Sequence, residues 1–389
     1  MDKYDALHLM FATCGAYVMP FISRRLMLPS SVGELLFGMM LASFIVPTAA
    51  AAEPLKLLSQ LGFILLMYIA GLELDLDRIS ALNRRELAAY VLFAVLLVAV
   101  SLGVTVLVGL PLFFALVIMT CAIGLLFTVL KDMDLVKTPL GQTLILISAV
   151  GEILTLAGIT LVSLIARSGT TRETLFQVLG IVLFVTAVFL VMRVLNLFLW
   201  WYPEMKRFFM SVGNPSEIGV RANLANMFIF VALAYFVGLE AILGAFLGGM
   251  IFAKLFADRE EMLERLSSFG YGFLIPLFFI EVGTRFRITD FFVPQVLFGA
   301  VTIALLMLLV RVVSSLPLLY SGVKLRSLPL VSLSLSFPLT LLVAVAATGD
   351  SLKLIDHGQT SVIILTAILT AIFYPWFMKL YGRAVPVAE

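Results

Sequence analysis

Apolar residues in this chain gather in long runs that are separated by short polar loops. Thirteen such runs are roughly 17–25 residues long, the length at which an α-helix crosses the hydrocarbon core of a bilayer. The pattern therefore predicts an all-α polytopic membrane protein with about thirteen transmembrane helices. Their approximate spans are 6–22, 31–47, 57–73, 88–109, 112–130, 140–166, 174–200, 218–238, 240–256, 268–284, 293–316, 327–348 and 360–381.

The first run resembles a secretory signal peptide in length, but its flanks argue against that interpretation. Asp2 and Asp5 make the preceding segment acidic, and no small-residue cleavage site follows the run. Arg24 and Arg25 end it. We expect a first transmembrane helix here, and the brief loops elsewhere predict no soluble domain.

Composition supports the membrane class and excludes others. Hydrophobic residues make up 62% of the 389 residues and charged residues 13%, with a mean hydropathy of +1.13, whereas soluble domains have about 25% charged residues. A formal net charge of +2 with no basic stripe argues against a nucleic-acid partner. Two cysteines and two histidines, with no phosphate-cradling or nucleophile motif, predict no cofactor, no metal centre and no enzyme.

The basic residues predict the orientation. Most Lys and Arg residues lie in loops that follow odd-numbered runs. Because such loops face the cytoplasm in membrane proteins, we expect the N-terminus outside the cell membrane and the C-terminus in the cytoplasm.

An internal repeat refines the architecture. Gly33–Met40 recurs in type as Gly244–Ile251, and Leu58–Gly62 leading to Gly71 is echoed by Leu266–Gly270 leading to Gly283. Runs 1–6 then correspond to runs 8–13, with run 7 as a linker, so the second copy enters the bilayer from the opposite side. We expect two inverted six-helix repeats, a plan common in secondary transporters. The predicted domains are 1–166, a linker at 167–217, and 218–389.

Runs 5 and 12 hold corresponding positions in the two repeats, and both carry residues that can interrupt a helix. Run 5 contains Thr120 and Gly124 at mid-depth, and run 12 contains Ser336 and Pro338. Proline removes a backbone donor and clashes with the preceding turn. We predict two broken crossover helices, whose free backbone ends would meet ions at the bilayer midplane; an ordinary kinked helix is the alternative.

Two ionisable residues stand almost alone in apolar runs. Glu152 lies near the middle of run 6, and Arg311 lies in run 11. Such residues are costly at bilayer depth and usually face a bundle interior or a wet cavity. Ser148 and Thr155 share a helix face with Glu152, so their hydroxyls could support the carboxylate or an ion. A purely structural Glu152–Arg311 pair is the alternative.

Several segments in this order resemble the membrane part of the monovalent cation:proton antiporters, of the sodium/proton exchanger and potassium-efflux types. The resemblance spans essentially the whole chain, and the segments that carry it are Val32–Gly38, Leu61–Asp75, Gly244–Gly249 and Pro276–Gly283.

The resemblance implies a homodimer with a panel domain of helices 1–3 and 8–10 and a transport core of helices 4–6 and 11–13. It also implies that Glu152 binds the cation or proton, and that a polar partner usual at the preceding position is replaced here by Gly151. Arg311 matches a basic residue expected on helix 11. Glu281 departs from the family pattern, and we interpret it as a partner of Arg311.

From these residues we expect a secondary antiporter that exchanges Na⁺ or K⁺ for H⁺ by alternating access, with one titrating carboxylate and therefore electroneutral. The expected cation and proton ligands are Glu152, Ser148, Thr155 and Thr120, with Arg311 and Glu281 balancing charge. Two alternatives stay open: an anion carrier that uses Arg311 on the same fold, and a channel-like potassium-efflux subunit.

Overall fold

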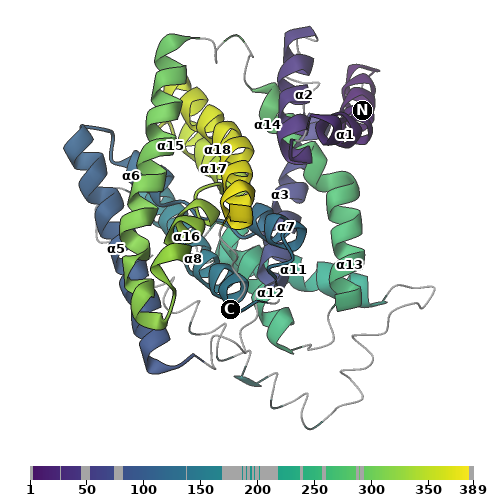
Figure 1. Ribbon diagram of the computed structural model, residues 1–389. Coiled ribbons are helices and arrows are strands. Elements are labelled where there is room, and N and C mark those ends of the chain that lie inside the picture. Colours follow the sequence, from purple (N-terminus) through teal and green to yellow (C-terminus); the bar gives the residue numbers. More distant parts are fainter. Residues whose placement is uncertain are drawn as a thin grey trace. The chain divides into compact units, whose positions relative to one another are not determined.

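A computed structural model describes residues 3–26, 28–44, 53–73, 82–136, 138–168, 218–236, 240–255, 260–285 and 293–384, with a few single positions between 186 and 201 and residue 289. All regular elements within these ranges are helices (Figure 1). The predicted linker helix at 174–200 lies largely outside the described residues.

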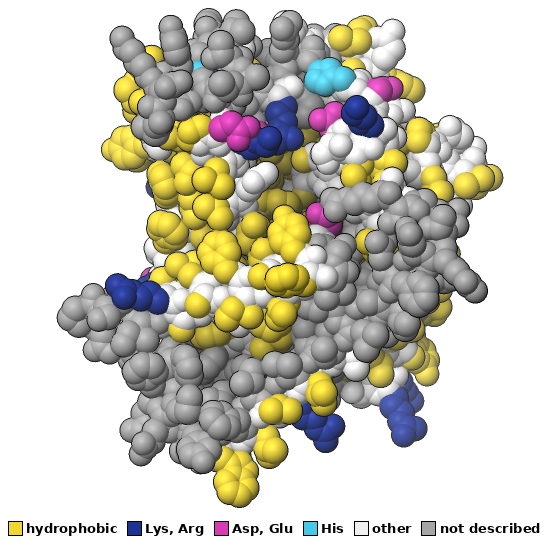
Figure 2. Space-filling model, turned by 180° about the vertical axis from the view of Figure 1, so that it is seen from behind, with side chains coloured by type: hydrophobic (Ala, Val, Ile, Leu, Met, Phe, Trp, Pro, Cys, Tyr) yellow, Lys and Arg dark blue, Asp and Glu magenta, His cyan; other side chains and the backbone are white. Residues whose placement is uncertain are grey.

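Eight helical segments among the described residues are long and apolar enough to cross a membrane, and one bent pair could form a ninth span. Their surfaces are correspondingly apolar: Leu107, Phe236 and Phe298 expose 86%, 89% and 76% of their area. Figure 2 shows hydrophobic side chains over much of the described surface on one face. Such exposure suits a lipid environment rather than water, so the chain is a multi-pass membrane protein.

The described residues form two compact units. The first unit holds residues from Met1–Ile22, Gly33–Ser80 and Thr160–Arg285, and the second holds residues from Ser23–Val32, Ala81–Ile159 and Phe286–Glu389. The first contains most of α1 (Lys3–Arg25) and α2 (Ser30–Phe44), together with α3 (Glu53–Glu73), α11 (Ile218–Phe236), α12 (Ala241–Leu255), α13 (Glu260–Phe269), a π-helical turn (Gly270–Leu274) and α14 (Ile275–Thr284).

Helices of the first unit approach one another through glycines. A Cβ atom built on Gly38 would lie 2.0 Å from the carbonyl oxygen of Ile280, and one on Gly283 would lie 2.2 Å from that of Leu35. The same arrangement joins α3 to α12: a Cβ on Gly71 would lie 2.1 Å from the oxygen of Phe246, and one on Gly249 would lie 2.2 Å from that of Tyr68. Small residues at these points let helix backbones touch, which is how membrane helices gain packing energy.

The second unit contains α5 (Arg84–Val108), α6 (Phe113–Met119), α7 (Gly124–Asp132), α8 (Pro139–Ser168) as far as Ile159, α15 (Pro294–Ser315), α16 (Leu328–Ser334), α17 (Leu339–Ser351) and α18 (His357–Ala384). Short 3₁₀ helices, Leu316–Ser321 and Leu325–Ser327, connect α15 to α16. A capping box of Asn83 and Glu86 starts α5, and Gly109 ends it with a φ of 75°.

Both predicted helix interruptions are present in the second unit. Run 5 is divided into α6 and α7 by the non-helical residues 120–123. Run 12 is divided into α16 and α17, whose axes are bent by 47°. Pro338 is the residue immediately before α17, where its missing N–H costs no helical hydrogen bond.

Candidate functional site

Arg311 is fully buried in α15 and makes its contacts with the interrupted helices. Its Nε donates to the carbonyl oxygen of Leu335 at 2.8 Å, just after α16, and its Nη1 donates to that of Ile118 in α6 at 2.5 Å. Nη2 donates to the oxygen of Thr120, the residue that ends α6. A further bond from Nη1 reaches the oxygen of Met307 at 2.9 Å. The bonds to Leu335, Ile118 and Thr120 therefore satisfy carbonyl groups that the breaks leave without helical partners.

The described hydrogen-bond partners of Arg311 all lie within the second unit. The hydrogen bonds of its guanidinium go to four carbonyl oxygens and, at 3.8 Å, to the sulfur of Cys121. Glu281 instead pairs with Arg285, with Oε1 3.0 Å from Nη2, and accepts a hydrogen bond from Ser59 at 3.3 Å. Glu281 thus has a cation one helical turn along α14, and its pairing with Arg311, a residue of the other unit, stays a prediction.

Glu152 is buried on α8, with 1% of its area exposed. Its Oε2 accepts a hydrogen bond of 3.0 Å from the backbone N–H of Ile123, the residue immediately before α7. The carboxylate thus lies at the N-terminal end of a half-helix, where the helix dipole favours negative charge. The carboxylate and the guanidinium contact opposite ends of the same break.

The hydroxyl groups predicted to assist Glu152 are arranged differently from one another. Thr155 Oγ1 accepts a hydrogen bond from the N–H of Cys121 at 3.2 Å and donates to the oxygen of Gly151 at 2.8 Å. The hydroxyl of Thr120 donates back to Leu116 at 2.7 Å. Ser148 is fully buried, and within the described part of the chain its hydroxyl has no hydrogen-bond partner. Thr155 stabilises the break between α6 and α7 through its bond with Cys121. Ser148 has a hydroxyl oxygen one helical turn from Glu152 that is not hydrogen-bonded within the described residues.

Cys121 is a site residue that sequence reasoning did not single out. A Cβ atom on Gly151 would lie 2.6 Å from the Cβ and 2.8 Å from the Sγ of Cys121. Glycine at 151 therefore makes room for the thiol, which fills the space that a polar side chain at 151 would need. The only sequence signal was the coincidence of a cysteine in one broken run and a glycine beside the buried acid.

The remaining predicted residues of the breaks have local roles. Ser336 donates its hydroxyl hydrogen to the oxygen of Ser332 at 2.6 Å, and so satisfies a carbonyl at the end of α16. Gly124 begins α7, and a Cβ there would meet nothing within 4 Å. Gly124 is thus not required by packing in the described structure.

The Glu152 carboxylate and the Ser148 hydroxyl, which has no hydrogen-bond partner in the part of the chain that the structure describes, both offer oxygen atoms. Oxygen is the ligand type that hard cations prefer. Among the described residues no group of three or more His, Cys, Asp or Glu side chains could hold a metal ion. The arrangement has a buried acid held at a helix break, as expected of an ion-translocating membrane protein.

A multi-pass bundle with a buried acid at an interrupted helix is typical of a membrane ion transporter, and comparison with known proteins identifies its family. The family model for the transmembrane part of the sodium/hydrogen exchangers matches residues 9–379. The chain belongs to the sodium/hydrogen exchanger family, whose members are cation/proton antiporters and not enzymes.

Relatives agree with this family. The chain is 28% identical to a putative Na⁺/H⁺ antiporter, YjbQ, of Bacillus subtilis, over 95% of this chain and 62% of the relative, so it spans less than two thirds of that protein. It is 24% identical to a Na⁺/H⁺ antiporter of Enterococcus hirae, over 97% of each. The fold resembles that of the sodium proton antiporter MjNhaP1 of Methanocaldococcus jannaschii, with a TM-score of 0.61 and 14% identity, over 97% of this chain and 96% of that one.

Proposed function

We propose that this chain exchanges a monovalent cation, Na⁺ or K⁺, for H⁺ by alternating access, with Glu152 as the shared binding group. The observation that carries the proposal is the burial of Glu152 against the N–H of Ile123. A carboxyl group there can hold a proton or, once ionised, a cation, but not both. Competition for one site couples the two fluxes.

Ser148 is the first candidate for a further cation ligand. Its hydroxyl is buried one turn from Glu152 and has no hydrogen-bond partner among the described residues. The oxygen of Thr155 already accepts from Cys121, and the hydroxyl of Thr120 is turned to its own helix. We therefore assign Thr155 and Thr120 a structural role at the break between α6 and α7, and we assign Ser148 a role as a cation ligand.

Exchange at this site is one-for-one and electroneutral. Arg311 stays protonated, and its charge is balanced by the carbonyl ends of α6 and α16. Glu152 alone changes its proton occupancy, so the loaded site carries the same charge with H⁺ as with Na⁺. For Na⁺ exchange in proteoliposomes whose voltage is clamped with K⁺ and valinomycin, the initial rate should not depend on voltage; a clear dependence would refute the one-for-one scheme.

The inverted repeat belongs to the same proposal, and the glycine contacts of the first unit support it. In the sequence alignment of the two copies, Gly38 corresponds to Gly249 and Gly71 to Gly283. The contact of Gly38 with α14 therefore has its counterpart in the contact of Gly249 with α3. We further propose that the protein is a homodimer in the cell membrane, with the N-terminus outside, and that the second unit holds the transport core.

The test is reconstitution with a pH-sensitive dye and successive additions of Na⁺, K⁺ and Li⁺. Cation-driven proton movement is expected from the unaltered chain and should be abolished in Glu152→Gln, because the amide is nearly isosteric but does not titrate. Glu281→Gln is the matched control, since it changes a buried glutamate that Arg285 already neutralises. Transport by a folded Glu152→Gln protein would overturn the mechanism.

An anion carrier built on Arg311 is not favoured by this geometry. The donors of the guanidinium already face carbonyl oxygens and the Cys121 sulfur, so an anion would have to displace them. Adding candidate anions in the same assay would expose such transport.

A further inference from the structure

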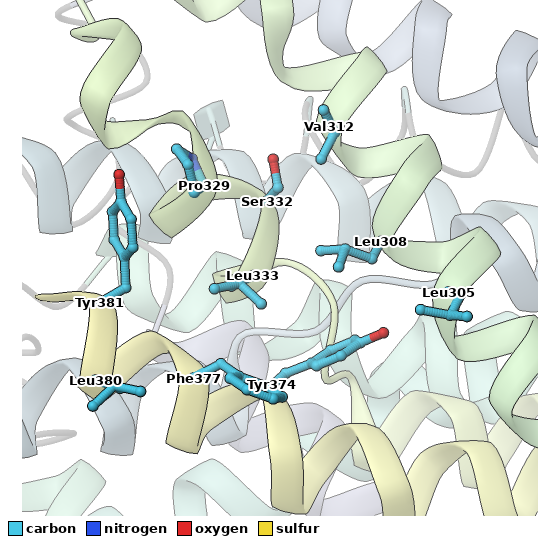
Figure 3. A pocket seen from close by; sticks show the side chains of 10 residues that line it. All are labelled: Leu305, Leu308, Val312, Pro329, Ser332, Leu333, Tyr374, Phe377, Leu380 and Tyr381. Atoms are coloured by element: carbon cyan, nitrogen blue, oxygen red, sulfur yellow. The ribbon is translucent and has the colours of Figure 1, made fainter.

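A cavity of about 630 Å³ lies in the second unit, apart from the residues that surround Glu152. Its walls come from α15, α16 and α18 (Figure 3). Figure 3 shows Tyr381 and Leu380 at one end and Leu305 at the other. The lining residues are Leu305, Leu308, Val312, Pro329, Ser332, Leu333, Tyr374, Phe377, Leu380 and Tyr381. The volume is that of a site for a small molecule.

Each hydroxyl group in the lining is already used. Tyr374 donates to the carbonyl oxygen of Ala304 at 2.8 Å, Ser332 donates to that of Leu328 at 3.0 Å, and Tyr381 donates to that of Arg326 at 2.8 Å. A polar solute would find few unsatisfied partners in this lining and would lose its hydration. A hydrocarbon chain has no hydrogen bonds to water to give up, so the lining favours an acyl chain.

Three basic residues lie next to one end of the cavity along the chain. Tyr381 is bonded to the backbone of Arg326, whose side chain is exposed. Lys324 lies two residues away from Arg326, and Lys379 precedes the lining residue Leu380 on α18. Basic residues beside a pocket between membrane helices suit an anionic lipid headgroup.

We propose that this cavity is a binding site for an anionic phospholipid, with an acyl chain between α15, α16 and α18 and the phosphate beside Arg326 and Lys379. Arg311 donates to the carbonyl oxygen of Leu335, the residue that follows α16. The lipid would therefore lie against one of the interrupted helices. The basic residues near one end and an apolar lining whose hydroxyl groups are all used together distinguish this lipid from the lipids that surround any membrane protein.

Fluorescence quenching by brominated lipids tests the proposal. In a chain whose tryptophans 200, 201 and 376 are changed to phenylalanine, Phe377→Trp places a reporter in the cavity wall. Val91→Trp is the matched control, because Val91 is exposed on α5, which does not line the cavity. Brominated phosphatidylglycerol should quench the cavity reporter at lower lipid fractions than brominated phosphatidylcholine, and the control should show little preference.

Removing a charge should weaken that preference. Arg326→Gln and Lys379→Gln should each lower the preference for the anionic lipid about fivefold, while Arg84→Gln at the start of α5 should leave it unchanged. Native mass spectrometry of the chain with its tryptophans intact should show one retained phosphatidylglycerol that Arg326→Gln releases. Equal quenching at both reporters, or retention unaffected by Arg326→Gln and Lys379→Gln, would overturn the proposal.

Discussion

In the first unit helices meet through glycine, whereas in the second they are joined by a buried guanidinium. Gly38, Gly71, Gly249 and Gly283 bring backbones into direct contact and leave each helix continuous at that point. Arg311 instead spans a gap between helices whose carbonyl groups are exposed by breaks. The difference shows two ways to hold apolar helices together: one depends on the absence of a side chain, and the other depends on a charged side chain.

The strongest test of this contrast removes the guanidinium. Arg311→Ala removes the side-chain donor of the Leu335, Ile118 and Thr120 carbonyl groups inside the second unit, and the loss should cost about 3–5 kcal/mol of stability. Arg311→Lys keeps a charge but reaches fewer oxygens at once, so its loss should be smaller. Thermal unfolding in detergent measures both, and equal stability of Arg311→Ala and the unaltered chain would show that these bonds do not hold the helices.

A methyl group on a contact glycine tests the first unit. Gly38→Ala would bring its Cβ against the backbone of Ile280, which cannot move away alone, and should destabilise by about 1–3 kcal/mol. Gly103→Ala is the control, because nothing lies within 4 Å of the added atom and alanine favours a helix by roughly 0.5–1 kcal/mol. The two melting temperatures should therefore shift in opposite directions.

A double-mutant cycle tests whether Cys121 fills the place beside Glu152. Gly151→Ala should be destabilising because of the Cys121 side chain, and Cys121→Gly should relieve part of that loss. We expect a coupling of about 0.5–3 kcal/mol between the two changes. If the two changes had additive effects on thermal unfolding, the Cys121 side chain would not be what limits the size of the side chain at position 151.

The smallest effect should come from the ion pair of the first unit. Glu281→Gln removes the charge opposite Arg285, whose side chain is 37% exposed. We expect a loss of up to about 1 kcal/mol and unchanged cation exchange. A loss of exchange in this variant would show that Glu281 takes part in transport. The ion-transport residues would then not be confined to the second unit.

The sequence predicted the helices and their breaks well, because both depend on local chemistry. Run length marks a membrane span, and Pro338 marks a place where a helix cannot continue through its own hydrogen bonds. Burial of Glu152 and Arg311 also followed from their isolation in apolar runs. These features need no knowledge of which helices are neighbours.

The partners of those charges could not be predicted in the same way. Charge matching suggested an acid for Arg311, but a broken helix offers carbonyl oxygens that the sequence does not display. Gly151 was read as a missing polar partner, while the space beside it belongs to Cys121, thirty residues earlier in the chain. Such contacts depend on how α6 and α8 pack, and side-chain identity alone does not specify that.

The bonds of Arg311 also have a mechanical consequence. One side chain from α15 holds the end of α6, the residue after it, and the end of α16. None of the three helices can slide past the others without breaking several charge-assisted hydrogen bonds at once. In the alternating-access cycle proposed above, these helices would therefore travel as one rigid piece, and the N–H of Ile123 that holds Glu152 would travel with them.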